Sequence, residues 1–285
     1  MTASNPTAKV VVRTVDKVFD VRGRKNFQAL RGIDLDVRDN EFLCIVGPSG
    51  CGKSTLLRML GDLDTPSSGH VRIRRDSTAR PLSAMIFQEE SVFPWMTVAQ
   101  NAAYGLKITR TWRGRESEER IADLLDKTGL SAFRGFYPHQ LSGGMKQRLS
   151  LVRAWATNPE LLLMDEPFAA LDEQNKALLQ QELVKLWEAF RSTVVFITHS
   201  LEEAVLLGDR VAVMTSAPGR IKETLDVPFA RPRVVTSLRR SSEFNQLVTQ
   251  LWDSLGDEVE RARSAEVQIL TRRRDLMSAD AIAAR

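Results

Sequence analysis

Residues 47–54 read Gly47-Pro48-Ser49-Gly50-Cys51-Gly52-Lys53-Ser54, and Thr55 follows. The apolar run Phe42–Val46 precedes them, which predicts a buried strand that enters a glycine-rich turn and then a helix. Glycines let backbone N–H groups turn toward one anion, and the start of a helix adds partial positive charge. In this pattern Lys53 reaches the β- and γ-phosphates of a nucleotide and the Ser54 hydroxyl ligates Mg²⁺. A glycine turn without function is the alternative, and the strand before it and the helix after it argue against that.

The composition is that of a globular protein with one large or two small domains: 285 residues, 43% hydrophobic and 27% charged. No apolar stretch approaches the roughly 20 residues that span a bilayer, and no hydrophobic signal core starts the chain, so we expect no secretion. The net charge of +4 permits an anionic membrane surface or nucleic acid as a partner without requiring either. Cys44 and Cys51 cannot form a disulfide framework. The helix-start position of Cys51 predicts a lowered pKa for its thiol.

Four apolar runs share one design, because each ends in polar residues suited to phosphate chemistry. The runs and their endings are Phe42–Val46 with the glycine-rich loop, Ala84–Phe87 with Gln88, Leu161–Met164 with Asp165-Glu166, and Val194–Ile197 with Thr198-His199. Continuous apolar runs of this length are typical of parallel strands whose two faces are both covered. Ligands of open α/β sheets bind outside the carboxyl ends of the strands. We therefore predict that the four endings meet at one edge of one sheet.

The chemistry of phosphoanhydride hydrolysis gives each ending a role. Asp165 suits Mg²⁺, because a hard cation prefers carboxylate oxygen, and Glu166 can orient and deprotonate the attacking water. Gln88 can bridge the metal and that water, and His199 can contact the γ-phosphate and hold Glu166. A cap at Asp165, an exposed charge at Glu166 and a packed histidine are the structural alternatives, which the strand-end positions disfavour. We predict the catalytic set Lys53, Gln88, Glu166 and His199 and the metal set Ser54, Gln88 and Asp165.

A second candidate phosphate site lies at Leu141-Ser142-Gly143-Gly144-Met145-Lys146-Gln147-Arg148. Ser142 has the position of a helix N-cap, and the pattern through Leu149, Val152 and Trp155 predicts the helix that follows. Two glycines in the first turn leave backbone N–H groups accessible, so this helix start can also bind an anion. The alternative is a well-capped helix without a ligand.

Together these segments resemble the ATP-binding subunit of an ABC transporter. The matching segments occur in the family's order and are Gly47–Thr55, Gln88, Leu141–Met145, Leu161–Glu166, Ala170–Asp172 and His199. The resemblance covers roughly residues 10–225, and the Leu-Ser-Gly-Gly motif distinguishes this family from a generic P-loop kinase or GTPase. It implies an ATPase that uses ATP and Mg²⁺.

The resemblance also implies that two subunits pair head to tail with two ATP molecules between them. Ser142, Gly143 and Gly144 of one subunit then contact the γ-phosphate held by the other and stabilise charge where the chain has no evident arginine finger. Asp172 matches the residue that acts across this interface, and a role as a helix N-cap is compatible with that. Phe19 matches the aromatic residue that stacks on adenine, with a buried core phenylalanine as the alternative. The predicted nucleotide contacts are Phe19, Gly47, Pro48, Ser49, Gly50, Cys51, Gly52, Lys53, Ser54, Thr55, Gln88, Ser142, Gly143, Gly144 and Asp172.

The implied fold is α/β, with a P-loop (RecA-like) parallel-sheet core, an antiparallel β subdomain, an inserted helical subdomain and a short helical C-terminal extension. Alternating apolar residues over 10–40 predict the antiparallel strands. Residues 41–90 and roughly 156–225 carry the parallel strands. The predicted units are a flexible N-terminus at 1–9, an ATPase domain at 10–225 with its helical subdomain at about 91–155, and a basic connector with a helical extension at 226–285.

The C-terminal part of the chain has its own pattern. Arg231-Pro232-Arg233 predicts a basic, extended connector. Apolar residues then fall at helical spacing at Phe244, Leu247, Leu251 and Leu255, which predicts an amphipathic helix packed on the main domain.

Details of the sequence resemble the nitrate, sulfonate and taurine importer group, namely Phe87–Glu90, Phe93–Val98, Asp165–Asp172, Ser216–Ile221 and Arg231–Arg233. The chain departs from the family at Ser200, where aspartate more commonly follows the histidine. The resemblance implies peripheral attachment to the cytoplasmic face of the membrane, through permease subunits, and an extracytoplasmic solute-binding protein as an indirect partner. Ser91–Met96 then forms the groove that receives a permease helix, unless its aromatic residues pack into the helical subdomain. The expected cargo is nitrate, taurine or an aliphatic sulfonate.

A soluble ABC-type ATPase that acts on nucleic acid or ribosomes is the competing function. In this family, DNA-repair members carry long coiled-coil insertions, and translation members carry two cassettes in one chain. This chain has neither feature, so we expect no nucleic-acid partner.

Overall fold

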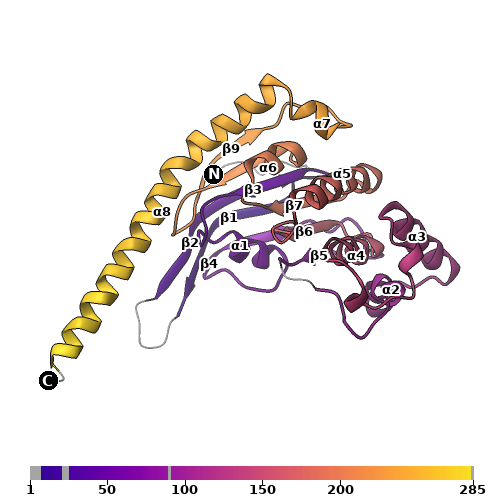
Figure 1. The fold of residues 1–285 in the computed structure, drawn as a ribbon, viewed down its shortest axis with the longest axis horizontal. Helices are drawn as coiled ribbons and strands as arrows, with labels where there is room; N and C mark the ends of the chain where they lie inside the picture. The colour runs from indigo at the N-terminus through magenta and orange to yellow at the C-terminus, as the bar shows by residue number, and fades with distance from the viewer. Residues whose placement is uncertain (1–7, 21–25, 89–90, 284–285) are drawn as a thin grey trace.

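A six-stranded sheet forms the centre of the molecule (Figure 1). The structure is a computed structural model that describes residues 8–20, 26–88 and 91–283. Strands β5, β6, β7, β3 and β8 lie parallel in that order, and β9 pairs antiparallel with β8. These strands are β3 (Phe42–Val46), β5 (Ser83–Ile86), β6 (Leu161–Asp165), β7 (Thr193–Ile197), β8 (Arg210–Met214) and β9 (Ile221–Asp226). The four apolar runs are therefore neighbours in one parallel sheet, as predicted.

The sheet separates two hydrophobic cores, and β3 contributes alternate residues to each. Phe42, Cys44 and Val46 belong to the core that includes α4, α5 and α6. Leu43 and Ile45 belong to the core that includes α1 and the second sheet. These helices are α1 (Lys53–Leu60), α4 (Gly143–Ala156), α5 (Glu173–Phe190) and α6 (Leu201–Leu207). Because side chains alternate across a strand, a strand that is apolar at every position has to be covered on both faces.

The second sheet is antiparallel, in the order β2-β1-β4. Its strands are β1 (Ala8–Phe19), β2 (Phe27–Arg38) and β4 (Ser68–Ile73). The flexible N-terminus predicted at 1–9 needs a correction at its end, because Ala8 and Lys9 already belong to β1; residues 1–7 lie outside the described residues. Lys9 is buried, and its ammonium group forms ion pairs with Glu160 and, at 2.6 Å, with Asp76. These ion pairs could not be predicted from local sequence patterns, because the partners are far apart in the chain.

Helices α2 (Val98–Ile108), α3 (Arg115–Lys127) and α4 form a lobe at one end of the molecule, where the helical subdomain was predicted (Figure 1). The start of α2 is set by a reciprocal cap. The Thr97 hydroxyl accepts a hydrogen bond from the Gln100 N–H at 3.3 Å, and the Gln100 side chain accepts one from the Thr97 N–H at 2.9 Å. This capping box satisfies two backbone donors that the helix leaves unpaired.

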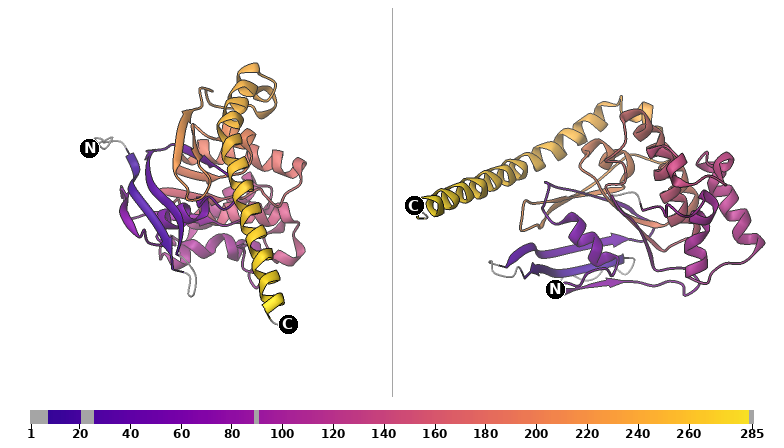
Figure 2. Two further views of the ribbon diagram at one scale, coloured as in Figure 1. Left: turned by 90° about the vertical axis from the view of Figure 1, so that its left-hand side faces the viewer. Right: turned by 60° about the horizontal axis from the view of Figure 1, so that its bottom comes forward.

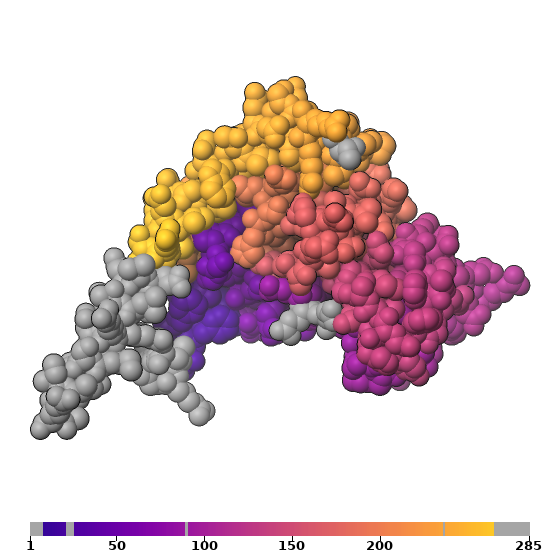
Figure 3. All heavy atoms as spheres, in the orientation of Figure 1, coloured from indigo at the N-terminus to yellow at the C-terminus, as the bar shows by residue number. Residues whose placement is uncertain are grey.

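The C-terminal extension consists of the short helix α7 (Val235–Leu238) and the 42-residue helix α8 (Ser242–Ala283). Phe244, Leu251 and Leu255 are buried, as their spacing predicts. The helix is much longer than the short extension expected from that pattern, because good helix formers without proline continue after it. Figure 2 shows its second half passing beyond both sheets, and in Figure 3 its first half lies along the rest of the molecule. Among the described residues, no helix is both long and apolar enough to cross a membrane.

The connector between β9 and α7 packs Arg231 and Arg233 against the end of α6. Arg233 is 7% exposed, and its Nη1 donates hydrogen bonds to the carbonyl oxygens of Leu206 at 2.9 Å and Gly208 at 2.7 Å. Burial lowers the pKa of Arg233 to about 10, which leaves it charged at neutral pH. Arg231 donates to the Asp209 carboxylate at 2.9 Å. Because cations complement the negative end of a helix, these arginines hold the connector against the end of α6.

Candidate functional site

The glycine-rich loop passes from β3 into α1, and the helix begins at Lys53 as predicted. Gly52 precedes it with a φ of +100°, a left-handed conformation that glycine adopts readily. A Cβ atom at this position would lie 2.6 Å from Leu30 Cδ2 and 3.0 Å from the Ala29 carbonyl oxygen. Neither the backbone conformation nor the available space admits another residue. The N–H groups at the start of α1 are therefore available to an anion.

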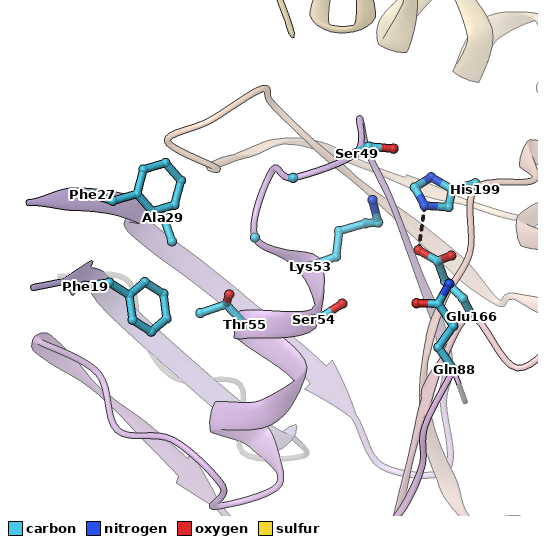
Figure 4. Close-up of a pocket in the computed structure, with 12 residues that line it drawn as sticks. Phe19, Phe27, Ala29, Ser49, Lys53, Ser54, Thr55, Gln88, Glu166 and His199 are labelled. Carbon is cyan, nitrogen blue, oxygen red and sulfur yellow. Dashed lines mark ion pairs between the residues drawn. The ribbon is translucent and has the colours of Figure 1, made fainter. Parts of the chain in front are cut away.

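The Lys53 ammonium group is held against the loop itself. Its Nζ donates hydrogen bonds to the carbonyl oxygens of Gly47 at 2.9 Å and Pro48 at 3.0 Å, and the residue is buried. An ammonium group has three donors, so one remains for a phosphate. Figure 4 shows this amino group directed between Ser49 and His199. A cation positioned in this way stabilises phosphate charge without a large rearrangement.

A cleft of about 270 Å³ opens beside the loop (Figure 4). It brings together ten of the predicted site residues: Phe19, Ser49, Gly50, Gly52, Lys53, Ser54, Thr55, Gln88, Glu166 and His199. Phe27 and Ala29 of β2 also line it, and the sequence analysis did not identify them. Phe27 is the pairing partner of Phe19 in the antiparallel ladder. Phe27 could have been predicted as a site residue from the sequence, because it and Phe19 stand at the facing ends of two predicted antiparallel strands.

Two of the predicted metal ligands, Ser54 and Gln88, line this cleft, and the third, Asp165, contacts Ser54. The Ser54 hydroxyl donates a hydrogen bond to the Asp165 carboxylate at 3.1 Å, and Gln88 lines the same cleft as Ser54. All three offer oxygen, which Mg²⁺ prefers. Magnesium sites commonly use one or two protein carboxylates and complete the shell with phosphate and water oxygens. The residues present therefore fit a magnesium ion that is bound together with a nucleotide.

Burial raises the pKa of Asp165, and the Ser54 hydrogen bond and the charge of Lys53 only partly oppose it. Protons and Mg²⁺ therefore compete for this carboxylate at a higher pH than for an exposed aspartate. We expect the Mg²⁺ affinity of the ATP-bound chain to fall as the pH drops through this raised pKa. Titrations with Mg²⁺ at several pH values measure this affinity. The Asp165→Asn chain, which has no carboxylate at this position, shows how far the protonation of ATP itself changes the Mg²⁺ affinity. Identical pH profiles for the two chains would refute it.

Glu166 and His199 meet at the ends of β6 and β7 (Figure 4). The His199 Nε2 lies 2.5 Å from the Glu166 carboxylate. Glu166 has a φ of +46°, which is uncommon for a residue with a side chain, and its N–H donates to the Ile197 carbonyl oxygen at 3.0 Å. Strained conformations of this kind occur often at active sites. The geometry allows the histidine to orient the carboxylate toward the cleft, as predicted.

A buried network holds the segment that carries the histidine. The Thr198 hydroxyl donates to the carboxylate of Glu203, which also accepts a hydrogen bond from Gln180 at 3.0 Å. The Ser200 hydroxyl caps α6 by accepting from the Glu203 N–H at 3.3 Å. Serine and aspartate are comparable N-caps. The departure from the family at Ser200 therefore leaves the local structure intact.

Phe19 and Phe27, partners in the antiparallel ladder, both line the outer end of the cleft (Figure 4). Phe19 is 37% exposed and Phe27 is 48% exposed, so neither is a core residue. The Lys17 ammonium group lies 5.0 Å from the centre of the Phe19 ring. Exposed rings beside a phosphate loop suit the flat face of a nucleobase. This favours base stacking over the core alternative.

We predict that Phe19→Ala weakens ATP binding about tenfold, because one stack between a base and an aromatic ring is worth about 1–3 kcal/mol. The loss should be much smaller for inorganic triphosphate, which has no base. Equilibrium binding of both ligands measures the difference. Phe136→Ala, which truncates an equally exposed phenylalanine of the helical lobe, serves as the matched control. Equal losses for ATP and triphosphate would exclude stacking on Phe19.

The second candidate phosphate site, at the start of α4, lies outside the cleft around Lys53. The Ser142 hydroxyl accepts a hydrogen bond from the Met145 N–H at 3.3 Å, so it caps α4 as predicted, and Ser142 and Gly143 are exposed. Asp172 caps α5 by accepting from the Asn175 N–H at 3.0 Å. None of Ser142, Gly143, Gly144 or Asp172 lines the cleft around Lys53. One chain therefore presents its two candidate anion sites, the starts of α1 and α4, at separate places.

The prediction of a lowered thiol pKa at Cys51 is wrong. Cys51 has no exposed surface, and burial raises the pKa of its thiol, although the charge of Lys53 opposes the shift. Its side chain points behind the loop: a Cβ atom on Gly47 would lie 2.9 Å from the Cys51 sulfur. Local sequence located Cys51 at a helix start but gave no information on which way its side chain would point.

Comparisons with known proteins agree with this geometry. The family model described as ABC transporter matches residues 30–169. An uncharacterized ABC transporter ATP-binding protein of Methanocaldococcus jannaschii is 43% identical over 88% of this chain and 92% of its own length. A nitrate import ATP-binding protein of Synechococcus elongatus is 38% identical over 90% of this chain and 97% of its own. A solved dimeric cassette in a post-hydrolysis state, bound to ADP and phosphate, superimposes with a TM-score of 0.66 at 32% identity, over 78% of this chain and all of that one.

Proposed function

Because this chain belongs to the ABC transporter family as an ATP-binding ATPase subunit, we propose that it powers the import of a small anion through a membrane permease. The observation that carries the proposal is the nearly full-length similarity to a nitrate import subunit. Nitrate is the first candidate cargo, followed by taurine and aliphatic sulfonates. A peripheral position on the cytoplasmic face of the membrane, with an extracytoplasmic solute-binding protein as an indirect partner, completes the proposed complex.

The working unit is proposed to be a head-to-tail homodimer. Each Lys53 cleft is open to solvent and has no contribution from the Ser142 helix start of its own chain. A partner copy supplies that helix start in trans, so two ATP molecules are enclosed between two chains. Backbone N–H groups at Gly143 and Gly144 then stabilise charge on the γ-phosphate. Asp172, beside this surface on α5, is proposed to contact the partner.

Within the closed site, each residue has a separate proposed role in ATP hydrolysis. Glu166 accepts the proton of the attacking water, and His199 holds the carboxylate in position through the contact at 2.5 Å. Lys53 neutralises charge on the β- and γ-phosphates. When bound, Mg²⁺ polarises the phosphoryl oxygens and orients the triphosphate. Gln88 links this chemistry to the helical lobe, because it lies between the end of β5 and α2.

The proposed permease contact is the segment Ser91–Met96. Trp95 is 69% exposed, whereas Phe93 packs on Tyr104 with ring centroids 4.4 Å apart. Arg153 of α4 lies over the Phe93 ring at 5.0 Å and donates a hydrogen bond to the Ser91 hydroxyl at 3.0 Å. The segment thus has one aromatic residue that packs inward and one that faces solvent. An exposed tryptophan on a well-packed segment suits a protein contact.

The proposal is tested by purification from membranes followed by reconstitution. We expect the tagged chain to retain a polytopic permease after mild solubilisation. Proteoliposomes that contain the complex and its solute-binding protein should then accumulate nitrate, taurine or a sulfonate only with ATP. Glu166→Gln complexes should assemble but not transport. Recovery with ribosomes or nucleic acid instead of a permease would favour the competing function, which the transport proteins among its relatives do not support.

A further inference from the structure

The turn between β8 and β9, residues 215–220, packs directly behind the phosphate loop. A Cβ atom on Gly219 would lie 2.0 Å from the Cys51 carbonyl oxygen. The Gly219 N–H donates to the Ala29 carbonyl oxygen and the Gly219 carbonyl accepts from the Arg31 N–H, both at 2.9 Å. The turn therefore contacts the backbone of the loop and is hydrogen-bonded to β2, which lines the same cleft.

The turn is a closed unit rather than a loose loop. The Thr215 N–H donates to the Arg220 carbonyl oxygen at 2.9 Å, and the Thr215 hydroxyl accepts from the Arg220 N–H at 3.0 Å. Met214, the last residue of β8, also lies close to the start of the loop: its Cβ would be 3.0 Å from a Cβ on Gly47. The turn and the strand end that precedes it therefore contact the two ends of the phosphate loop.

The other side of the turn is held by α8. Glu258 is 2% exposed, and its carboxylate accepts hydrogen bonds from the Ser216 N–H at 2.9 Å and the Ser216 hydroxyl at 3.2 Å. Arg261 pairs with the same carboxylate at 2.8 Å, and Lys222 of β9 lies 3.8 Å away. Burial opposes the charge, but the hydrogen bonds from Ser216 and these two cations outweigh it and lower the pKa of Glu258. The carboxylate is thus an ionised acceptor at neutral pH.

We propose that Glu258 is a positioning residue for the nucleotide site. Its carboxylate holds Ser216, and the turn that carries Ser216 fixes the position of the phosphate loop through the contact of Gly219 with Cys51. Its effect is on ATP binding, because the turn touches the loop and not the carboxylate and histidine at the strand ends. The C-terminal helix is then part of the nucleotide-binding apparatus, although it lies outside the segment that the family model matches. The inference rests on the nucleotide site alone and not on the identity of the cargo.

Glu258→Ala is expected to raise the Kd for ATP by about three- to tenfold, in the range that residues linking two sites produce. The kcat at saturating ATP should change by less than about twofold, since the reacting groups are untouched. Glu258→Gln keeps an acceptor for the Ser216 N–H and should restore most of the affinity. Glu260→Gln, an exposed position on the same helix, is the matched control. A folded Glu258→Ala chain with unchanged ATP affinity would overturn the proposal.

If Glu258→Ala does not fold, hydrogen exchange on the unmodified chain decides the matter. Coupling between two sites is reciprocal, so ATP should slow amide exchange at Ser216–Gly219 and in α8 around Glu258. Unchanged exchange in both segments, with protection confined to the phosphate loop, would contradict the proposal. Both measurements use the isolated chain without a permease. The inference can therefore fail while the importer assignment stands, and transport can fail while the inference stands.

Discussion

Glu166→Gln should leave ATP binding close to normal and lower the rate of hydrolysis by about two to four orders of magnitude, the contribution of a positioned general base. The substitution keeps the shape of the side chain and its hydrogen bond to His199 but removes the basic oxygen. Binding is expected to persist because Lys53 and the start of α1, the proposed phosphate contacts, are unchanged. Steady-state phosphate release and equilibrium ATP binding measure the two effects separately.

The same variant should trap the closed dimer. With hydrolysis blocked, two ATP molecules remain between the subunits, so gel filtration with ATP should give a dimer and without ATP a monomer. Glu119→Gln, which alters an exposed carboxylate of α3, should hydrolyse ATP at the normal rate and form no stable dimer. A Glu166→Gln monomer that carries bound ATP would contradict the enclosed site.

Ser142→Arg should abolish hydrolysis while the isolated chain binds ATP almost normally. Ser142 is exposed and lies outside the cleft around Lys53, so a large cation there disturbs only the surface offered to a partner. Loss of its cap on α4 also costs about 1 kcal/mol of stability. Ser142→Ala isolates that cost, since it removes the cap without adding bulk. Thermal unfolding, ATP binding and ATPase rates of the three chains separate stability from function.

A loss of ATP affinity in the Ser142→Arg chain would show that this helix start serves its own cleft. Hydrolysis at the normal rate would show that the helix start at Ser142 takes part in neither ATP site. Only the combination of normal binding with lost turnover agrees with a site completed by the partner.

The parts of the fold that the sequence could predict are those set by local patterns. The apolar runs determine their strands because burial on both faces leaves β3 without a charged residue and confines the polar residues of β6 and β7 to their ends, at Asp165 and Thr193. Two helix starts follow from caps at Ser142 and Asp172, whose side chains accept the expected backbone hydrogen bonds. Because ligands of parallel sheets bind at the carboxyl ends of the strands, the residues that follow these strands could be predicted to line one cleft.

The parts that could not be predicted depend on contacts between distant segments. Phe27 reaches the cleft only through its pairing with Phe19, and the Cys51 side chain turns inward because Gly47 leaves room behind the loop. Arg233 belongs to the connector that the sequence predicts as basic and extended, but it is buried at the end of α6. For Phe27 and Arg233 the deciding partner lies on another element, so no local pattern predicts the contact.

The central claim is that each ATP site is built from two chains, and mixing two inactive variants tests it most directly. Lys53→Ala lacks the phosphate lysine, and Ser142→Arg lacks the helix start offered in trans, so each alone should be inactive. In a mixed dimer, the intact loop of the Ser142→Arg chain faces the intact helix start of the Lys53→Ala chain. An equimolar mixture should then recover about one quarter of the normal ATPase rate, because about half the dimers are mixed and each has one complete site of two. A mixture no more active than either variant alone would contradict the account.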